Sequence, residues 1–218
     1  MVSIYITLLG TCISLIFTSL TAYALAHKPL LGRHVVLFMV LFTMLFNGGM
    51  IPTYFVVKSL GLLNTLWALM IPNAISAFYL LVLKSFFQRI PEELRESARI
   101  DGSHELGVLF RIVIPLSLPA MAAFGLFYAV GIWNQYFAAI LYINDNTKWP
   151  VQVILRQILR VASGGTGEGQ EIVREGHVNV ANALKMAVIV IATVPILLVY
   201  PFLQKHFAKG VLLGSVKG

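Results

Sequence analysis

Long apolar runs restrict what this chain can fold into more than any other feature. Five stretches are mainly apolar: about 4–26, 35–57, 65–83, 113–142 and 182–203. Each is close to the roughly 20 residues that a helix needs to cross a bilayer. Only 11% of the residues are charged, whereas a soluble domain carries about 25%. We therefore predict an all-α membrane protein with about five transmembrane helices in a single domain, residues 1–218.

The distribution of basic residues predicts how these helices are oriented. Ten of the sixteen Lys and Arg residues fall in 27–34, 84–112 and the tail after 203, and such residues gather on the cytoplasmic side. This places the C-terminus inside the cell and a long loop, about 143–181, outside. The first apolar stretch then begins outside, which indicates that a preceding helix is missing from this chain. The net charge of +7 follows from this asymmetry, and no basic block favours nucleic-acid binding.

The most polar segment, residues 84–112, lies between two apolar stretches. It holds ten of the twenty-five charged residues, so we place it outside the hydrocarbon. Pro-Glu-Glu at 91–93 is typical of a helix start. Asp101-Gly102 is typical of a helix end, because glycine accepts the left-handed conformation found there. Between them, Leu94 and Ala98 are four residues apart and are expected to share one face.

A second short helix is predicted directly after this glycine. Ser103 is expected to cap it, with Glu105 in its first turn. One apolar stripe follows, formed by Leu106, Leu109, Phe110 and Val113. The segment therefore predicts two cytoplasmic helices joined by a glycine bend, with a charged tip suited to a cleft on a partner.

The spacing within this segment closely resembles the EAA loop of bacterial ABC importer permeases. Glu96-Ser97-Ala98 is followed after three residues by Gly102, and after nine more by the run Ile-Val-Ile-Pro at 112–115. The family pattern is E-A-A, three residues, G, nine residues, I-x-L-P; serine replaces its second residue and isoleucine its leucine. The stretch 60–72 and the tail 207–218 look like the second-subunit permeases of the carbohydrate-uptake, maltose-type family. The resemblance thus covers essentially the whole chain.

The resemblance implies the type-I ABC importer permease fold and a set of partners. These are a second permease forming a heterodimer, two ATPase subunits and an extracellular solute-binding protein that delivers a carbohydrate. Such a chain is a transporter subunit and not an enzyme; it binds no cofactor itself, and ATP and Mg are held by the ATPase. The family has six helices, which agrees with a missing first one. A coupling loop, about 84–115, is expected to contact the ATPase through Glu93, Glu96, Ser97, Ala98, Asp101, Gly102, Ile112 and Pro115.

Polar and helix-breaking residues also interrupt the apolar stretches, at 47–49, at 72–73 and at 133–136. Broken helices are tolerated where freed backbone groups meet other helices or a water-filled cavity. Amide and aromatic side chains recognise sugars, so a substrate pathway is predicted along Asn73, Trp133, Asn134, Gln135 and Tyr136. The alternative is that these residues hold helices together.

A helix outside the membrane is predicted to start after Trp149-Pro150. Its apolar face comprises Val151, Ile154, Leu155, Ile158 and Leu159. Such a helix either lies in the membrane interface, with Trp149 among the headgroups, or receives the binding protein. The long insertion that contains it resembles the branch taking up oligosaccharides, including uronate-containing ones.

The sequence contains no recognisable pattern for a metal site, a catalytic site or a phosphate-binding loop. The five histidines have no metal-binding spacing, so no metal or catalytic site is predicted. The glycine-rich stretch 163–169 lacks the G-K-[ST] ending of a phosphate loop. Cys12, in an apolar run, is expected to pack as a small hydrophobic residue. Ion-coupled secondary transport remains the alternative function, although no Asp or Glu lies within a predicted span; a membrane enzyme is the other.

Overall fold

The computed structural model describes residues 1–27, 29–162 and 183–198, and within these residues the secondary structure is entirely helical. The helices are α1 Val2–Ala26, α2 Arg33–Leu45, α3 Met50–Ser59, α4 Trp67–Met70, α5 Ala77–Gln88, α6 Glu92–Ile100, α7 Glu105–Val108, the π-helix η1 Leu109–Val113, α8 Ile114–Leu116, α9 Leu118–Trp133, α10 Phe137–Tyr142, the 3-10 helix η2 Asn146–Lys148 and α11 Val151–Ala162. A further helix, Ala183–Leu198, follows. The predicted all-α class is confirmed.

Most of the predicted spans are broken helices. Among the described residues, α1 is the one uninterrupted helix long and apolar enough to cross a membrane. The second span is split between α2 and α3, where Gly49 has a φ of +86°, and the third is split between α4 and α5. In the fourth, the chain bends by 87° between Leu116 and Leu118 and is interrupted again after Trp133. The breaks predicted at 47–49, 72–73 and 133–136 are therefore present, whereas the bend between Leu116 and Leu118 was not predicted.

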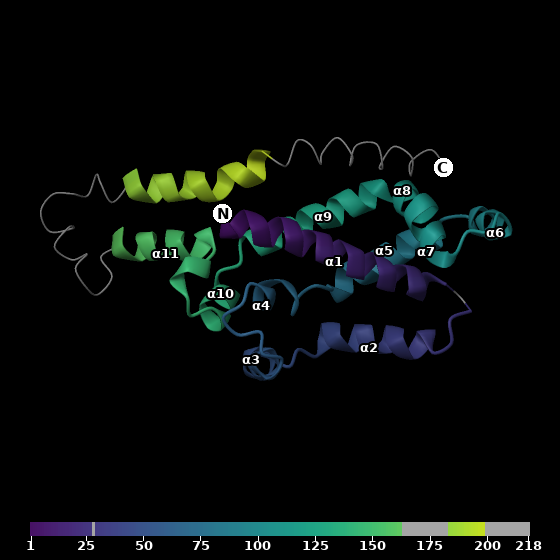
Figure 1. Cartoon of the computed structure of the whole chain (residues 1–218), viewed down its shortest axis with the longest axis horizontal. Helices are drawn as coiled ribbons and strands as arrows, with labels where there is room; N and C mark the ends of the chain where they lie inside the picture. Colours follow the sequence, from purple (N-terminus) through teal and green to yellow (C-terminus); the bar gives the residue numbers. More distant parts are fainter. Residues whose placement is uncertain (28, 163–182, 199–218) are drawn as a thin grey trace, which may run out of the picture.

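Three long helices lie side by side along the long axis of the molecule. α1 packs against both α5 and α9, and α2 lies beside α5 (Figure 1). At one end of this bundle are α6 and α7; at the other are α3, α4, α10 and α11. The described parts of two basic segments, residues 27 and 29–34 and residues 84–112, therefore lie at the same end, in agreement with the orientation rule (Figure 1).

Two apolar cores form, one toward each end of α1. The core near α6 contains residues from α1, α5, α6, α7, η1 and α9, including Tyr23, Phe87 and Ala98. The core at the opposite end contains Ile6, residues of α3 and α4, and Val153 of α11. Both α1 and α9 contribute to the two cores, and these two helices therefore connect the two ends of the molecule.

Small residues allow α1 and α9 to approach each other closely. A Cβ atom on Gly10 would lie only 2.9 Å from Cδ1 of Ile132. The buried hydroxyls of Thr18 and Tyr128 are 2.7 Å apart, a polar contact of the kind that joins helices in membranes. Cys12 does not pack inside the described part of the chain as expected, because its side chain is exposed there.

Candidate functional sites

The charged segment begins where α5 ends. Pro91 is the N-cap residue of α6, with φ −53° and ψ 135°, so the helix starts at Glu92, one residue later than predicted. Glu92 and Glu93 occupy its first turn and Arg99 its last. This arrangement complements the helix dipole at both ends and explains why so polar a sequence is helical here.

The predicted glycine bend is confirmed. Gly102 has a φ of +81°, a conformation that costs any residue with a Cβ atom. The amide N–H of Ser103 donates to the carbonyl of Ala98 at 2.9 Å. The amide N–H of Gly102 donates to the carbonyl of Arg99 at 3.0 Å. These bonds satisfy carbonyls that a helix end leaves unpaired.

The cap of the second helix differs from the prediction. His104, not Ser103, is the N-cap of α7, and its Nδ1 accepts a hydrogen bond from the amide of Gly107 at 2.9 Å. The chain needs one more residue to leave the glycine bend, so the capping position falls one residue later. A Cβ atom on Gly107 would lie 2.8 Å from Nδ1 of His104, so this contact depends on glycine.

The side of α6 that packs against the rest of the chain contains Arg95 and Ala98 but not Leu94, although Leu94 and Ala98 were expected to share one face. Leu94 is 43% exposed, whereas Arg95 is 5% exposed and Ala98 is 8% exposed. The Arg95 guanidinium donates to the carbonyls of Phe87 and Ile90, where α5 ends. A cation at a helix C-terminus satisfies carbonyls that lack partners. These hydrogen bonds orient α6 so that the Arg95 side chain is buried against the end of α5.

The predicted apolar stripe is divided. Leu109 and Val113 are fully buried, but Leu106 and Phe110 are about half exposed. Residues 109–113 form a π-helix, whose wider turn changes the angular spacing on which the prediction rested. Exposed apolar side chains therefore surround the tip on both sides of the bend: Leu94, Ile100, Leu106 and Phe110.

One carboxylate joins three helices at this end. Glu105 of α7 accepts from Nε of Arg99 of α6 at 2.8 Å and from the hydroxyl of Tyr23 of α1 at 2.7 Å. The Tyr23 hydrogen bond and the Arg99 ion pair hold the pKa of Glu105 below its ordinary value. The tip is thus tied to a helix of the bundle by charge-assisted hydrogen bonds, the stronger kind.

The structure divides the predicted coupling residues into an exposed and a packed set. Glu93, Glu96, Ser97, Asp101, Gly102 and Pro115 are exposed, whereas Ala98 is buried and Ile112 packs against the same core. Sequence reasoning missed the positioning residues Tyr23, Arg95 and Arg99. Tyr23 lies 82 residues from its partner Glu105, so no local pattern reveals this contact.

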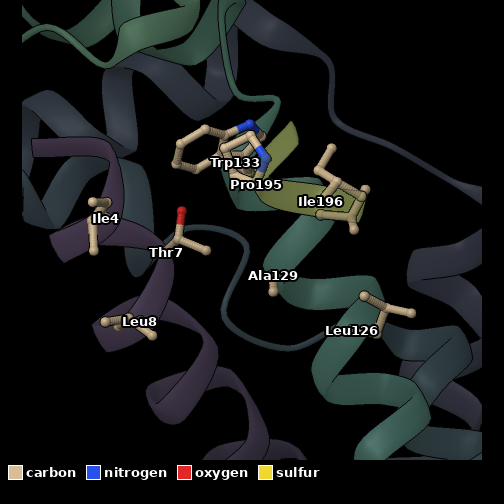
Figure 2. A pocket seen from close by; sticks show the side chains of 9 residues that line it. Ile4, Thr7, Leu8, Leu126, Ala129, Trp133, Pro195 and Ile196 are labelled. Atoms are coloured by element: carbon tan, nitrogen blue, oxygen red, sulfur yellow. The ribbon is translucent and has the colours of Figure 1, made fainter. Parts of the chain in front are cut away.

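The predicted pathway residues do not form one group. Trp133 points toward the last described helix, where its indole N–H donates to the carbonyl of Ala192 at 3.1 Å. It lines a cavity of about 170 Å³ with α1 and with Pro195 and Ile196, shown in Figure 2. The lining is almost wholly apolar, which suits lipid or helix packing better than a sugar.

Three of the predicted residues share a second cavity, of about 410 Å³. It is lined by Asn134, Gln135, Tyr136, Phe137, Ala138 and Arg156, and we call it the α9–α10 cavity. Nε2 of Gln135 donates to the carbonyl of Leu69 at 3.0 Å, which ties the break to α4. Asn73, in the break between α4 and α5, is exposed and does not line this cavity.

Arg156 comes from α11, whose predicted apolar face was partly wrong. Val153 and Leu155 are buried, whereas Ile154 is 44% exposed. Neighbours pack against more than one side of the helix, because the amide of Val151 donates to Ser3 of α1 and Arg156 lies over Tyr136. Trp149 packs against the core beside α11, and its indole N–H donates to the carbonyl of Ile143 at 3.0 Å.

Comparison with known proteins decides the family. Residues 7–213 match the family described as "Binding-protein-dependent transport system inner membrane component". This chain belongs to that family. It is a membrane permease subunit of an ABC importer, with the all-α type-I fold, and not an enzyme.

Two relatives of the permease come from Bacillus subtilis (strain 168). The polygalacturonan/rhamnogalacturonan transport system permease protein YtcP is 59% identical over 218 residues, which cover 100% of this chain and 76% of YtcP. Protein LplC is 57% identical over 217 residues, covering 100% of this chain and 73% of LplC.

A solved structure shares the fold of the permease. It is the crystal structure of a bacterial ABC transporter involved in the import of the acidic polysaccharide alginate. The TM-score is 0.84 at 34% sequence identity, over 94% of this chain and 73% of that one. A permease of this family works with a binding protein, an ATPase and a second permease.

Proposed function

We propose that this permease carries a carbohydrate, an oligosaccharide delivered by an extracellular binding protein, across the bacterial plasma membrane. The path forms between this chain and a second permease in a heterodimer, and two ATPase subunits supply the energy. Residues 1–218 form one permease domain in this arrangement, with the C-terminus in the cytoplasm. The permease binds no cofactor, and ATP and Mg belong to the ATPase. YtcP, a polygalacturonan/rhamnogalacturonan transport system permease protein that is 59% identical to this chain, supports a carbohydrate substrate.

The observation that carries the proposal is the anchored tip at the α6–α7 bend. The carboxylates of Glu93 and Glu96 at the tip are exposed and unpaired among the described residues. The part of the tip next to the bundle is fixed to α1 through Glu105 and to α5 through Arg95. A partner that binds this tip can move the bundle helices, because the contacts with α1 and α5 prevent the tip from rotating independently of the bundle. We propose that the partner is the ATPase, and that Glu96 meets a basic group on it.

The exposed apolar side chains around the tip fit such a contact. Leu94, Ile100, Leu106 and Phe110 are each between 43% and 86% exposed, and apolar side chains at the centre of an interface with charges at its rim are typical of protein docking. In the proposed orientation this end lies in the cytoplasm, so lipid does not cover these residues.

ATP dependence tests this function against the ion-coupled carrier. The complex of permease, second permease, ATPase and binding protein is reconstituted in vesicles with labelled oligogalacturonide. We expect uptake with ATP and none with a non-hydrolysable analogue. Uptake by the two permeases alone, driven by a proton or sodium gradient, would instead establish the carrier.

A further inference from the structure

The α9–α10 cavity has the composition of a site for an acidic sugar. Here α9 ends at Trp133 and α10 begins at Phe137, and the residues between them leave the helix. The break places the amide side chains of Asn134 and Gln135 next to Arg156 of α11. Nε2 of Gln152 on α11 donates to Oδ1 of Asn134 at 3.4 Å, which holds the two elements together. A cavity of about 410 Å³ lies in the range of small-molecule sites.

Arg156 supplies the only charge among the residues lining the cavity. Its guanidinium carbon lies 4.2 Å from the centroid of the Tyr136 ring, within cation–π distance. No carboxylate of the described residues pairs with it. Asp145, in the turn before α11, is held by Thr147 and Lys148 instead. A guanidinium that lies over a ring, and whose edge donors have no partner among residues 1–27, 29–162 and 183–198, is suited to bind a carboxylate bidentately.

The amide side chains add positions for hydroxyl groups. Gln135 is fixed through Nε2 on Leu69, and its Oε1 is buried without a donor among the described residues. Asn134 is exposed beside it, and its amide nitrogen donates to the carbonyl of Val130 at 2.9 Å.

We propose that the α9–α10 cavity binds a uronic acid residue of the transported oligosaccharide, with Arg156 as the partner of its carboxylate and Tyr136 and the amides contacting the ring. This inference rests on the proposed function and specifies its substrate class. A neutral sugar would supply no carboxylate for this cation.

The test compares trigalacturonate with its fully methyl-esterified, neutral form, using the whole transporter in vesicles and one binding protein throughout. Arg156→Gln is expected to raise the KM for trigalacturonate by about tenfold or more, because it removes a charge-assisted contact. Uptake of the ester should persist. Arg156→Lys, which keeps the charge but lacks the planar fork, should fall between the two.

Arg160→Gln is the matched control, because Arg160 lies one turn further along α11, is exposed, and does not line the cavity. It should change neither KM. Equal losses for acid and ester in Arg156→Gln, or no loss for either, would overturn the carboxylate site. A wild-type transporter that takes up only the ester overturns it too, while leaving carbohydrate transport intact. Wild type that takes up neither saccharide with ATP would instead refute the proposed function.

Discussion

Substitution of Gly102 separates backbone conformation from side-chain size at the tip. A Cβ atom added there would meet no heavy atom within 4 Å, so a new side chain has room. The cost arises only from the φ of +81°, which is about 1–2 kcal/mol for a residue other than glycine. Asparagine enters this conformation more readily than most residues, and a β-branched residue is a true outlier in it.

We therefore expect a graded series. Gly102→Asn should stay near wild type, Gly102→Ala should be intermediate, and Gly102→Val should be lowest. A penalty of one to two kcal/mol corresponds to a factor of about 5–30 in the population holding the native bend. The assay is the ratio of ATPase rates with and without loaded binding protein in reconstituted vesicles, for variants present at equal levels.

Gly32 provides a control with the same strain outside the tip. It has a φ of +76°, and an added Cβ atom would again meet nothing within 4 Å. Gly32→Val should therefore lower the stimulation ratio much less than Gly102→Val. A series ordered by side-chain size, with asparagine as damaging as valine, would refute the reasoning, as would equal effects at both glycines.

Two further predictions concern the same end of the molecule. Glu105 has a lowered pKa, so its contribution to stability is complete above its unfolded value of about 4.3 and is lost as the pH falls through the lower folded value. The difference in unfolding midpoint between wild type and Glu105→Gln should stay constant from pH 7 to pH 5 and shrink as the pH falls from 5 to 3, measured for the purified complex; a constant difference over the whole range would contradict this. For topology, Cys12 is first replaced by alanine, because it is exposed, and single cysteines are placed at Asn146 and Asp101, both exposed. An impermeant thiol reagent should label only the first in intact cells, and labelling of both would reverse or abolish the proposed orientation.

Features decided by neighbouring residues could be predicted from the sequence. The glycine bend at Gly102 was predicted because one residue needs a conformation that others avoid. The breaks at 47–49, 72–73 and 133–136 were predicted because proline, glycine and amides interrupt helices locally. The spacing of the charged segment likewise indicated the family before any comparison.

Contacts between distant residues could not be predicted in this way. Nothing near Glu105 indicates Tyr23, and nothing near Tyr136 indicates Arg156. Trp133 and Tyr136 are three residues apart, yet they serve different cavities, because the helix ends between them.

Apolar patterning also gave little information about which side of a helix is buried. In α1, Ile6 is fully buried and Leu8 is 66% exposed, although both are large and apolar. In a soluble protein the exposed side would be polar, and the pattern would reveal it. A membrane is itself apolar, so no hydrophobic driving force distinguishes a neighbouring helix from lipid. The sequence therefore determined which segments are helical and where they break, and only the close packing of small and polar residues decided which sides meet.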